Sequence, residues 1–480
     1  MRSSYTGDFN FSKYLEQVCD AETIHYIGQV VGVRGLEIES EGPRSVIGEI
    51  CTIKLGDGSS MIAEVVGLNG KIVKLSPFGD TKGIEIGCEV IATGSVLKVP
   101  VGKSLLGRVL DATGHPYDDL GEIVPDTYYP AVANAPNAMT RLPITKRIQT
   151  GIRAVDSLLT VGKGQRVGIF AGTGIGKSTL LSMVARNTNA DINVIGLIGE
   201  RGRELLDFIN RDLGEEGLKR SVLVVATSDQ PAICRVRAAY VCTAIAEYFR
   251  DQGKDVMLMF DNLTRFSLAQ REIGLSNGEP PTESGFTPSV FNMLPKLLER
   301  TGTNDKGSIT ALYAVLVEGD DLNNPIADAV RGILDGHIVL DRKLANANHY
   351  PAIDVLQSIS RLSKRLIGSE TKKAVTKIRR LMSVYADNET MITAGIYQKG
   401  TSPQIDEAIQ MHEPIFEFLE QEEEELCKME DTLKKLSALS GIEIPESEYA
   451  ENAGLLKADI DENPEDEDSE SQVHLNESIL

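Results

Sequence analysis

The 480-residue chain contains no tryptophan and few aromatic residues, and its six cysteines form no Cys-x-x-Cys pair. Most of the cysteines lie in apolar stretches, which favours buried thiols in a reducing compartment over a disulfide framework or a zinc site. The longest apolar run, residues 308–317, is far shorter than the ~18 residues of a membrane-spanning helix. Residues 1–24 lack a basic segment followed by an apolar one, so we expect no secretory signal. We therefore expect a cytoplasmic protein with, at most, peripheral membrane association.

Basic residues are also in short supply, since 49 Lys and Arg face 70 Asp and Glu for a formal charge of −21. The acid is unevenly placed: residues 441–480 contain thirteen Asp or Glu and a single Lys, which leaves a charge of only −9 for residues 1–440. A dedicated nucleic-acid-binding protein usually carries a basic domain, so we expect no nucleic-acid partner. The polar, acidic composition of residues 445–480 predicts a disordered tail.

A 41% hydrophobic fraction leaves room for several folded domains in a chain of this length. From residue 25 to residue 111, short β-rich runs separated by Gly, Asp and Pro clusters predict a small β-barrel domain or sandwich. These runs are residues 26–33, 46–53, 61–67, 71–75, 89–93 and 105–110. A proline-containing linker over residues 112–143 follows.

Beyond the linker, apolar strand candidates alternate with helical stretches. The candidates are residues 166–171, 193–198, 221–226, 256–260, 308–317 and 337–340. Continuous apolar runs of this kind are typical of parallel strands buried on both faces. Together with its linker, an α/β nucleotide-binding domain is therefore predicted over residues 112–367.

Strands become scarce after residue 368. Apolar residues at 374, 378, 381, 382 and 385 share one helical face, and a second helical stripe runs from Ile415 to Leu436. Four acidic residues, 422–425, interrupt this stripe and are expected to form a solvated helix face. A helical C-terminal domain is thus predicted over residues 368–444.

Directly after the 166–171 run, residues 171–179 read AGTGIGKST and lead into an apolar helical stretch. This strand–loop–helix context is the one that a phosphate-binding loop (P-loop) requires. Its glycines let successive backbone N–H groups surround phosphates, while Lys177 reaches the β- and γ-phosphates and the Ser178 hydroxyl ligates Mg²⁺. We therefore predict ATP and Mg²⁺ as cofactors. The predicted nucleotide-binding residues are Gly172, Thr173, Gly174, Ile175, Gly176, Lys177, Ser178 and Thr179.

Two acidic residues follow other strand candidates. Asp261 ends the 256–260 run and can hold Mg²⁺ through water. Glu200 follows the 193–198 run; if that strand neighbours the P-loop strand, its carboxylate would face the γ-phosphate and could orient or deprotonate the attacking water. Arg201 could then stabilise phosphate charge, and Glu204 could support the waters on the metal. A charged surface turn would have the same composition, so the fold must decide.

Near the end of the α/β domain, Tyr350 and Arg361 are further candidates. A tyrosine after an irregular segment can stack on an adenine ring, and an arginine at a subunit edge can reach a neighbour's γ-phosphate. A packed tyrosine and a surface arginine are the ordinary alternatives, and both remain open at this point.

These motifs resemble those of the type III secretion ATPases. The resemblance rests on residues 171–179, 199–204, 260–266, 269–274, 278–282 and 318–321, and residues 324–340 most resemble the flagellum-specific branch. The family is similar to the catalytic subunits of rotary ATP synthases. The resemblance therefore implies a RecA-like P-loop core between an N-terminal β-barrel and a C-terminal helical domain, assembled as a homohexamer with nucleotide between subunits.

The resemblance also implies roles for individual residues. Glu200 would be the catalytic carboxylate, Arg201 would contact phosphate and Arg265 would lie near the γ-phosphate, with the P-loop and Asp261 in the roles given above. Tyr350 would stack on adenine, with Tyr397 as a second aromatic wall of that pocket. Arg361 would be a finger inserted from the adjacent subunit.

In function, the resemblance implies that ATP hydrolysis drives release of substrates from chaperones and export of flagellar proteins at the cytoplasmic face of the inner membrane. The implied partners are a stator-like regulator, a stalk protein, export-gate membrane proteins and chaperone–substrate complexes. The first residues would bind the regulator, and Phe11, Tyr14, Leu15 and Val18 offer one apolar face for a protein partner.

Four other functions are considered: a virulence type III secretion ATPase, a rotary ATP synthase subunit, a non-catalytic nucleotide-binding assembly subunit and a Rho-like nucleic-acid translocase. Glu200 and Arg361 in one chain favour a homohexamer over a rotary synthase. Non-catalytic subunits typically lack the hydrolytic carboxylate. RNA-stimulated turnover would identify a translocase.

Overall fold

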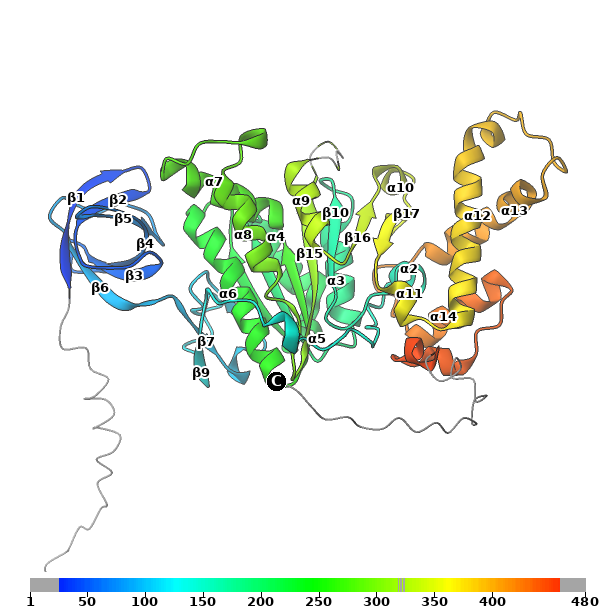
Figure 1. Ribbon diagram of the computed structural model, residues 1–480, viewed down its shortest axis with the longest axis horizontal. Helices are drawn as coiled ribbons and strands as arrows, with labels where there is room; N and C mark the ends of the chain where they lie inside the picture. Colours follow the sequence, from blue (N-terminus) through cyan, green and yellow to red (C-terminus); the bar gives the residue numbers. More distant parts are fainter. Residues whose placement is uncertain (1–25, 318, 320–321, 323, 458–480) are drawn as a thin grey trace, which may run out of the picture.

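The computed structural model describes residues 26–457 except 318, 320, 321 and 323. These residues form a β-barrel, a central α/β core and a helical C-terminal region, which follow one another along the long axis of the molecule (Figure 1). This order confirms the predicted fold class. Among the described residues, no helix combines the length and the apolar character needed to cross a membrane. The predicted N-terminal segment, residues 1–24, lies outside the described residues.

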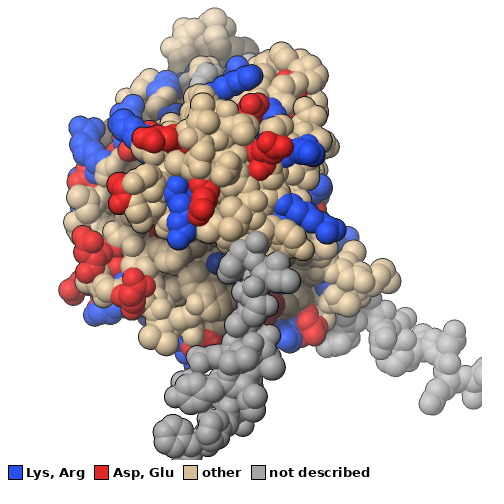
Figure 2. Space-filling model, turned by 90° about the vertical axis from the view of Figure 1, so that its left-hand side faces the viewer, with Lys and Arg blue, Asp and Glu red and all other residues tan. Residues whose placement is uncertain are grey.

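The barrel is closed, with the strand order β1-β2-β5-β4-β3-β6. Its strands are β1 (Ile27–Arg34), β2 (Glu37–Glu41), β3 (Glu49–Lys54), β4 (Ser60–Asn69), β5 (Ile72–Pro77) and β6 (Glu89–Val96). Alternate side chains such as Val30, Ile38 and Leu75 point inward and form its core. Seen from this end, basic and acidic side chains are interspersed among wide uncharged areas (Figure 2).

The predicted run 105–110 does not belong to the barrel. Its last two residues form β8 (Val109–Leu110), which pairs with β12 (Ser221–Ala226) of the central sheet. Leu105 and Leu110 are completely buried in the core of that sheet rather than in the barrel. The barrel strands therefore end at Val96, and the chain passes through β7 (Lys98–Val101) and β9 (Thr127–Pro130), an antiparallel pair that contains part of the predicted linker.

The central sheet has the strand order β17-β16-β10-β15-β13-β11-β12-β8. Its remaining strands are β10 (Arg166–Ala171), β11 (Ile192–Ile198), β13 (Asp255–Asp261), β14 (Gly302–Thr303), β15 (Ser308–Leu316), β16 (Gly336–Leu340) and β17 (Ile353–Ser360). In this order the strands from β16 to β8 run parallel to one another, whereas β17 runs antiparallel to β16. β14, which is outside this order, pairs antiparallel with β15. Sequence analysis assigned no strand at β17, because its apolar residues alternate with polar ones at the exposed edge.

Helices cover both faces of the sheet (Figure 1). On the barrel side lie α6 (Ala232–Asp251), α7 (Leu263–Ser276), α8 (Pro288–Leu298) and α9 (Pro325–Ile333). On the other side lie α2 (Arg153–Leu158) and α3 (Lys177–Asn187), which pack with the C-terminal helices into a second hydrophobic core. Shorter helices are α4 (Gly202–Asp207), α5 (Gly214–Lys219), α10 (Arg342–Asn346) and α11 (Ser363–Leu366).

The C-terminal region contains α12 (Ser369–Thr393), α13 (Pro403–Leu419) and α14 (Met429–Ser440). The predicted apolar face of α12 is buried at Ala374, Ile378 and Leu381. The second predicted stripe is not one helix, because α13 ends at Leu419 and residues 420–428 form a loop. This loop turns the buried Gln421 toward the core, where its amide accepts the N–H of Arg153 and donates to Gly151. The acidic residues 422–425 therefore lie in a loop rather than on a helix face.

The predicted start of the disordered tail at residue 445 is wrong. Residues 446–449 and 453–457 form two short 3₁₀ helices packed against the body of the molecule. Glu448 is buried, and its carboxylate accepts the backbone N–H groups of Glu370 (3.0 Å) and Thr371 (2.8 Å) in the first turn of α12. The chain is thus tied down because an acid satisfies the free N–H groups of a helix start. The rest of the predicted tail, residues 458–480, lies outside the described residues.

Candidate nucleotide-binding site

The P-loop lies at the carboxyl edge of the parallel sheet, between β10 and α3. Gly174 (φ +76°) and Gly176 (φ +89°) adopt left-handed conformations, which a side chain would disfavour and which turn the backbone around the loop. Within the described part of the chain, the backbone N–H groups of residues 172–177 donate no hydrogen bond. Together with the N-terminus of α3 they form a set of free donors that suits phosphate oxygens.

The two predicted carboxylates meet at Lys177. Its Nζ is paired with Asp261 at the end of β13 and lies 3.5 Å from Oε1 of Glu200, which follows β11. Sequence analysis made the role of Glu200 conditional on its strand neighbouring the P-loop strand. That condition is not met, because β15 and β13 lie between β10 and β11. Glu200 nevertheless reaches Lys177, since the carboxyl ends of all these parallel strands open onto one edge.

The charges of this cluster depend on one another. Burial would lower the pKa of Lys177, but the carboxylates of Asp261 and Glu200 outweigh it and hold the pKa above its usual value. Burial raises the pKa of Glu200, and the negative charges of Asp261 and Glu204 raise it too, whereas Lys177 and Arg265 lower it. The balance leaves the pKa of Glu200 above its usual value. Lys177 therefore stays cationic, and Glu200 is a more basic carboxylate than one in water.

Two residues that follow Asp261 complete the cluster. Asn262 donates its side-chain amide to Oε1 of Glu200 at 2.7 Å, and its own side-chain oxygen accepts the N–H of Arg265 at 2.8 Å to cap α7. Arg265 packs over Gly199, where an added Cβ would lie 2.8 Å from the Arg265 Cβ. Its Nε is buried and has no partner among the described residues. A buried donor of this kind beside the P-loop cluster suits an anionic ligand.

Arg201 and Glu204 lie outside this cluster. Both side chains are largely exposed, and they face each other at 3.6 Å across the first turn of α4. In this arrangement they match the charged surface turn that the sequence left open, and neither contacts Lys177 or Asp261. Ser178 lies next to Lys177 at the exposed start of α3, on the side of the free N–H groups.

The two tyrosines proposed for the adenine pocket are far apart. Tyr350 lies beside the P-loop, since a Cβ added to Gly176 would be 3.4 Å from its ring, and 39% of its surface is exposed. Tyr397 belongs to the loop between α12 and α13. Figure 1 shows that this loop lies at the end of α12 that points away from the sheet. Its hydroxyl bonds to Ser402 and Asp406 of the same region. The structure therefore does not bring Tyr397 to the nucleotide site, because α12 carries that loop away from the sheet.

Two residues near the P-loop, Arg342 and Asn262, were not predicted from the sequence. The guanidinium of Arg342 donates to the carbonyl of Thr173 at 3.3 and 3.4 Å, and Asn262 contacts Glu200 as described above. Asn262 directly follows the strand-end Asp261, so its position at the carboxyl edge was available as a signal. Arg342 begins a short helix after β16, and no sequence pattern singled it out.

Arg361 lies beside the amino-terminal ends of the parallel strands, whereas the P-loop lies at their carboxyl-terminal ends. It directly follows β17, whose last residue, Ser360, pairs with Gly336 at the start of β16. β16 is parallel to β10, so this position corresponds to the beginning of β10, whereas the P-loop follows its end. The exposed Arg361 side chain therefore cannot reach the P-loop of its own chain.

The donor set also suits a magnesium ion bound together with phosphates. Mg²⁺ is commonly held by one or two carboxylates plus substrate phosphate oxygens rather than by an all-protein cage. Asp261 supplies a buried carboxylate and Ser178 a hydroxyl beside the P-loop donors. Accordingly, the described residues contain no group of three or more His, Cys, Asp or Glu side chains placed to hold a metal ion.

Three family models match the chain in the order of its domains. The beta-barrel domain of the ATP synthase alpha/beta family matches residues 30–94, and the nucleotide-binding domain of that family matches residues 151–360. The C-terminal domain of the type III secretion ATPase EscN matches residues 367–438.

Curated relatives cover nearly the whole chain. A flagellum-specific ATP synthase of Treponema pallidum is 56% identical over 90% of this chain and 97% of its own length. The protein of the same name in Bacillus subtilis is 53% identical over 87% of this chain and 95% of its own length. A type 3 secretion system ATPase of Xanthomonas euvesicatoria is 50% identical, over 86% and 94% of the two chains.

Solved structures show the same likeness. The assembled ATPase EscN of the enteropathogenic E. coli type III secretion system is 43% identical to this chain and superposes with a TM-score of 0.82, covering 86% of this chain and 100% of EscN. EscN in complex with its central stalk EscO is 42% identical and superposes with a TM-score of 0.80 over the same shares.

Proposed function

This chain belongs to the family of flagellum-specific and type III secretion ATPases, and from that premise we propose that it hydrolyses ATP at the Lys177 cluster to drive the export of flagellar proteins. The observation that carries the proposal is the convergence of Lys177, Glu200 and Asp261 beside a loop of free backbone donors. The flagellar branch is supported by the identities of 56% and 53% to flagellum-specific relatives. The virulence branch remains the second candidate, because the relative from Xanthomonas is 50% identical.

We assign the chemical roles from the contacts in the site. The free N–H groups of the P-loop and Lys177 hold the β- and γ-phosphates, which then replace the carboxylates as partners of the Lys177 ammonium group. Glu200, oriented by Asn262, accepts a hydrogen bond from the attacking water and draws its proton. The unpartnered Nε of Arg265 lies near Glu200 and stabilises charge that develops on the γ-phosphate.

For the metal, we propose Mg²⁺ held by Ser178 and, through water, by Asp261. When bound, the ion neutralises negative charge on the β- and γ-phosphate oxygens. Glu204 is an exposed partner of Arg201, so its support of the metal waters is the least favoured of the proposed roles. Tyr350 provides a face for the adenine ring next to Gly176.

We further propose a ring of identical subunits in which Arg361 completes the site of the neighbour. The position of Arg361 at the sheet edge opposite its own P-loop supports this role in trans. The assembled state of EscN supports a ring, with six subunits as the expected number. The complex of EscN with its stalk supports a stalk protein as one partner of this chain. A regulator, export-gate proteins and chaperone–substrate complexes at the cytoplasmic face of the inner membrane complete the proposed setting.

Glu200→Gln tests the catalytic assignment. The amide keeps the shape of the side chain but cannot accept a proton from water, so kcat should fall by roughly 10²–10⁴-fold while ATP affinity stays within a few-fold. Steady-state hydrolysis and nucleotide titration by fluorescence measure the two quantities. The control is Glu216→Gln, which changes an exposed carboxylate on α5 in the same way. Turnover equal to the control in a folded Glu200→Gln protein would refute the assignment.

A further inference from the structure

Arg361 is held by one backbone and one side-chain hydrogen bond at the point where β16 begins and β17 ends. Its N–H donates to the carbonyl of Asp335 at 3.0 Å, and its guanidinium donates to the carbonyl of Arg331 at 3.2 Å. Asp335 directly precedes β16, and Ser360, the last residue of β17, directly precedes Arg361. The direction in which the Arg361 side chain leaves the sheet therefore depends on how Asp335 and Ser360 are fixed.

Gln165 contacts both of these residues. It is completely buried and directly precedes β10. Its side-chain nitrogen donates to the carbonyl of Asp335 (3.2 Å) and to the hydroxyl of Ser360 (3.1 Å), and its side-chain oxygen accepts the N–H of Gly162 at 2.9 Å. One amide group thus bridges the strand start and the strand end that flank Arg361.

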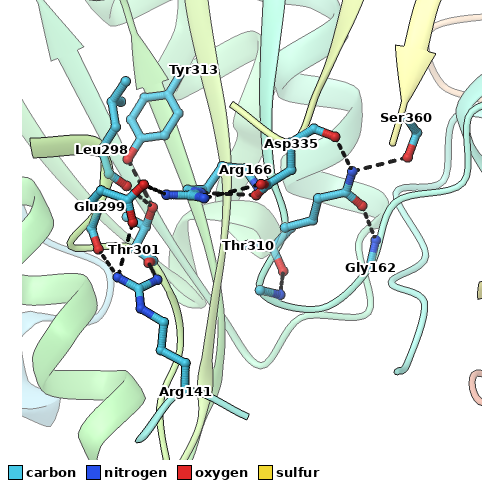
Figure 3. Close-up of polar contacts among 12 residues, drawn as sticks. Arg141, Gly162, Arg166, Leu298, Glu299, Thr301, Thr310, Tyr313, Asp335 and Ser360 are labelled. Atoms are coloured by element: carbon cyan, nitrogen blue, oxygen red, sulfur yellow. Dashed lines mark hydrogen bonds and ion pairs between the residues drawn. The ribbon is translucent and has the colours of Figure 1, made fainter. Parts of the chain in front are cut away.

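The next residue of the chain fixes Asp335 a second time. The carboxylate of Asp335 accepts three hydrogen bonds from Arg166, from its backbone N–H (3.1 Å), its Nε (3.0 Å) and its Nη2 (3.1 Å) (Figure 3). In return, the backbone N–H of Asp335 donates to the carbonyl of Arg166 at 2.9 Å. Asp335 therefore cannot move without displacing the first residues of β10, since charge-assisted hydrogen bonds of this kind are strong and directional.

The same strand leads to the P-loop at its other end. β10 comprises only Arg166–Ala171 and pairs with β15 on one side and β16 on the other, so one short, doubly paired strand joins its two ends. At its end it carries the P-loop of its own site, and at its beginning it holds the segment that carries Arg361. Gln165 and Arg166 take no part in the P-loop contacts described above.

We propose that Gln165 is a positioning residue that, through Asp335 and Ser360, holds Arg361 in the orientation needed to reach ATP in the adjacent subunit. This inference rests on the proposed role of Arg361 in trans. It makes β10 a direct mechanical link between the phosphate-binding loop of one site and the arginine delivered to the next. Rigid support of this kind matters because a misplacement of about 1 Å can cost ~10²-fold in rate.

Mixed rings test the inference, because Glu200 serves its own site and Arg361 serves the neighbour's. Glu200→Gln and Arg361→Ala should each retain only a small residual hydrolysis when assembled alone. In an equal mixture, a site is intact wherever an Arg361→Ala subunit supplies Glu200 and a Glu200→Gln neighbour supplies Arg361, which random assembly in a head-to-tail ring gives at about a quarter of sites. The recovered hydrolysis of this mixture is the reference.

Gln165→Leu is then placed in one partner of the mixture at a time. On the Glu200→Gln subunit, which donates Arg361, it should lower the recovered hydrolysis by ~10-fold. On the Arg361→Ala subunit, which supplies the P-loop and Glu200, the recovered hydrolysis should stay within ~2-fold of the reference. Sedimentation checks that the mixtures assemble equally. Ser360→Ala removes the hydroxyl that accepts from Gln165 (3.1 Å) and itself donates to the carbonyl of Thr160 (2.7 Å). It is tested in the same two arrangements and should give the same asymmetry.

Three results would overturn the inference. Equal losses in the two arrangements would make Gln165 a purely structural residue. A loss confined to the Arg361→Ala subunit would show that Gln165 acts on its own P-loop. Assembled mixtures of the two parental variants with no recovered hydrolysis would refute the role of Arg361 in trans, and with it both the shared site and the inference; this outcome is recognised before Gln165 is changed.

Discussion

Lys177 lies between two carboxylates, and this arrangement sets the charge of the site before nucleotide arrives. The ammonium group is paired with the buried Asp261 and lies 3.5 Å from Glu200. ATP must therefore compete with these acids for the lysine, while Glu200 gains basicity from burial and from its acidic neighbour. At the scale of single residues, the ability of Glu200 to accept a proton depends on the charges that lie close to it.

The acidic limb of the pH–rate profile reports on that charge balance. Glu200 must be ionised to accept a proton, so its raised pKa should make hydrolysis fall on acidification at a higher pH than an ordinary glutamate, with its pKa of 4.5, would allow. Arg265 lowers the pKa of Glu200, so Arg265→Ala should move the limb of its residual activity to still higher pH. The same variant should lower kcat by ~10²-fold if Arg265 also stabilises the transition state.

Arg265→Lys is the matched control for the pH profile. It keeps the positive charge near Glu200, and the limb should stay near that of the unchanged protein even if the rate falls. Normalised profiles of kcat/KM against pH for the three proteins give the comparison. A limb that Arg265→Ala leaves in place, or moves to lower pH, would contradict the proposed influence of Arg265 on Glu200.

At the scale of elements, the start of α12 is completed by a distant segment. Glu448 reaches the first turn of α12 from 77 positions later in the chain and accepts the N–H and the hydroxyl (2.6 Å) of Thr371. Its own carbonyl accepts a hydrogen bond from Arg147 at 2.7 Å. Gly368 permits this approach, because a Cβ there would lie 2.0 Å from the Glu448 carboxyl carbon. Residues 445–457 thus join the helical region to the α/β core.

Two truncations separate this segment from the residues that follow it. Removal of residues 458–480 should leave the unfolding free energy nearly unchanged, whereas removal of residues 445–480 should lower it by ~2 kcal/mol or more, because the N–H groups of α12 lose their acceptor. Urea unfolding followed by circular dichroism measures both. Glu448→Ala should by itself cost ~1–3 kcal/mol. The exposed Glu446→Ala is its control, and equal stability of the two variants would refute the capping role.

At the scale of the whole molecule, a buried ion pair joins the barrel to the core. Glu64 on β4 accepts hydrogen bonds from both Nε and Nη2 of Arg237 on α6, and the Glu64 side chain is only 3% exposed. The Arg237 guanidinium also lies over the ring of Tyr240, 5.4 Å from its centroid. This contact fixes the barrel relative to the helices that cover the sheet.

Substitutions at this pair should reveal how strongly the barrel is attached. Arg237→Met leaves the Glu64 carboxylate buried without its partner and should cost ~3–5 kcal/mol, whereas Arg237→Met combined with Glu64→Leu should regain much of that loss. Limited proteolysis of residues 97–143 and urea unfolding measure the attachment. The contact would not hold the barrel if Arg237→Met left both the proteolysis rate and the unfolding free energy unchanged.

Local patterns explain which parts of the fold could be predicted. The strands 166–171 and 221–226 have the predicted bounds, because a strand buried on both faces requires an unbroken apolar run. The P-loop depends on local backbone freedom at its glycines, which the sequence displays directly. The edge strand β17 was missed because an edge strand shows no such run. The break after Leu419 was missed because Gln421, in the loop that follows α13, is held by Arg153 and Gly151, more than 260 positions earlier in the chain.

By itself, the sequence determined the three domain types, the P-loop and the acids at strand ends, because each depends on residues close together in the chain. Only the tertiary structure decided that Glu200 meets Lys177 from a strand that does not neighbour β10, that Tyr397 lies away from that meeting point, and that Glu204 pairs with the exposed Arg201. It also decided that Glu448, one of the acidic residues near the C-terminus, caps the start of α12, although the surrounding sequence has the composition of a tail. The physical reason is that a charge acquires its role from the partners that folding places around it, and composition does not reveal those partners.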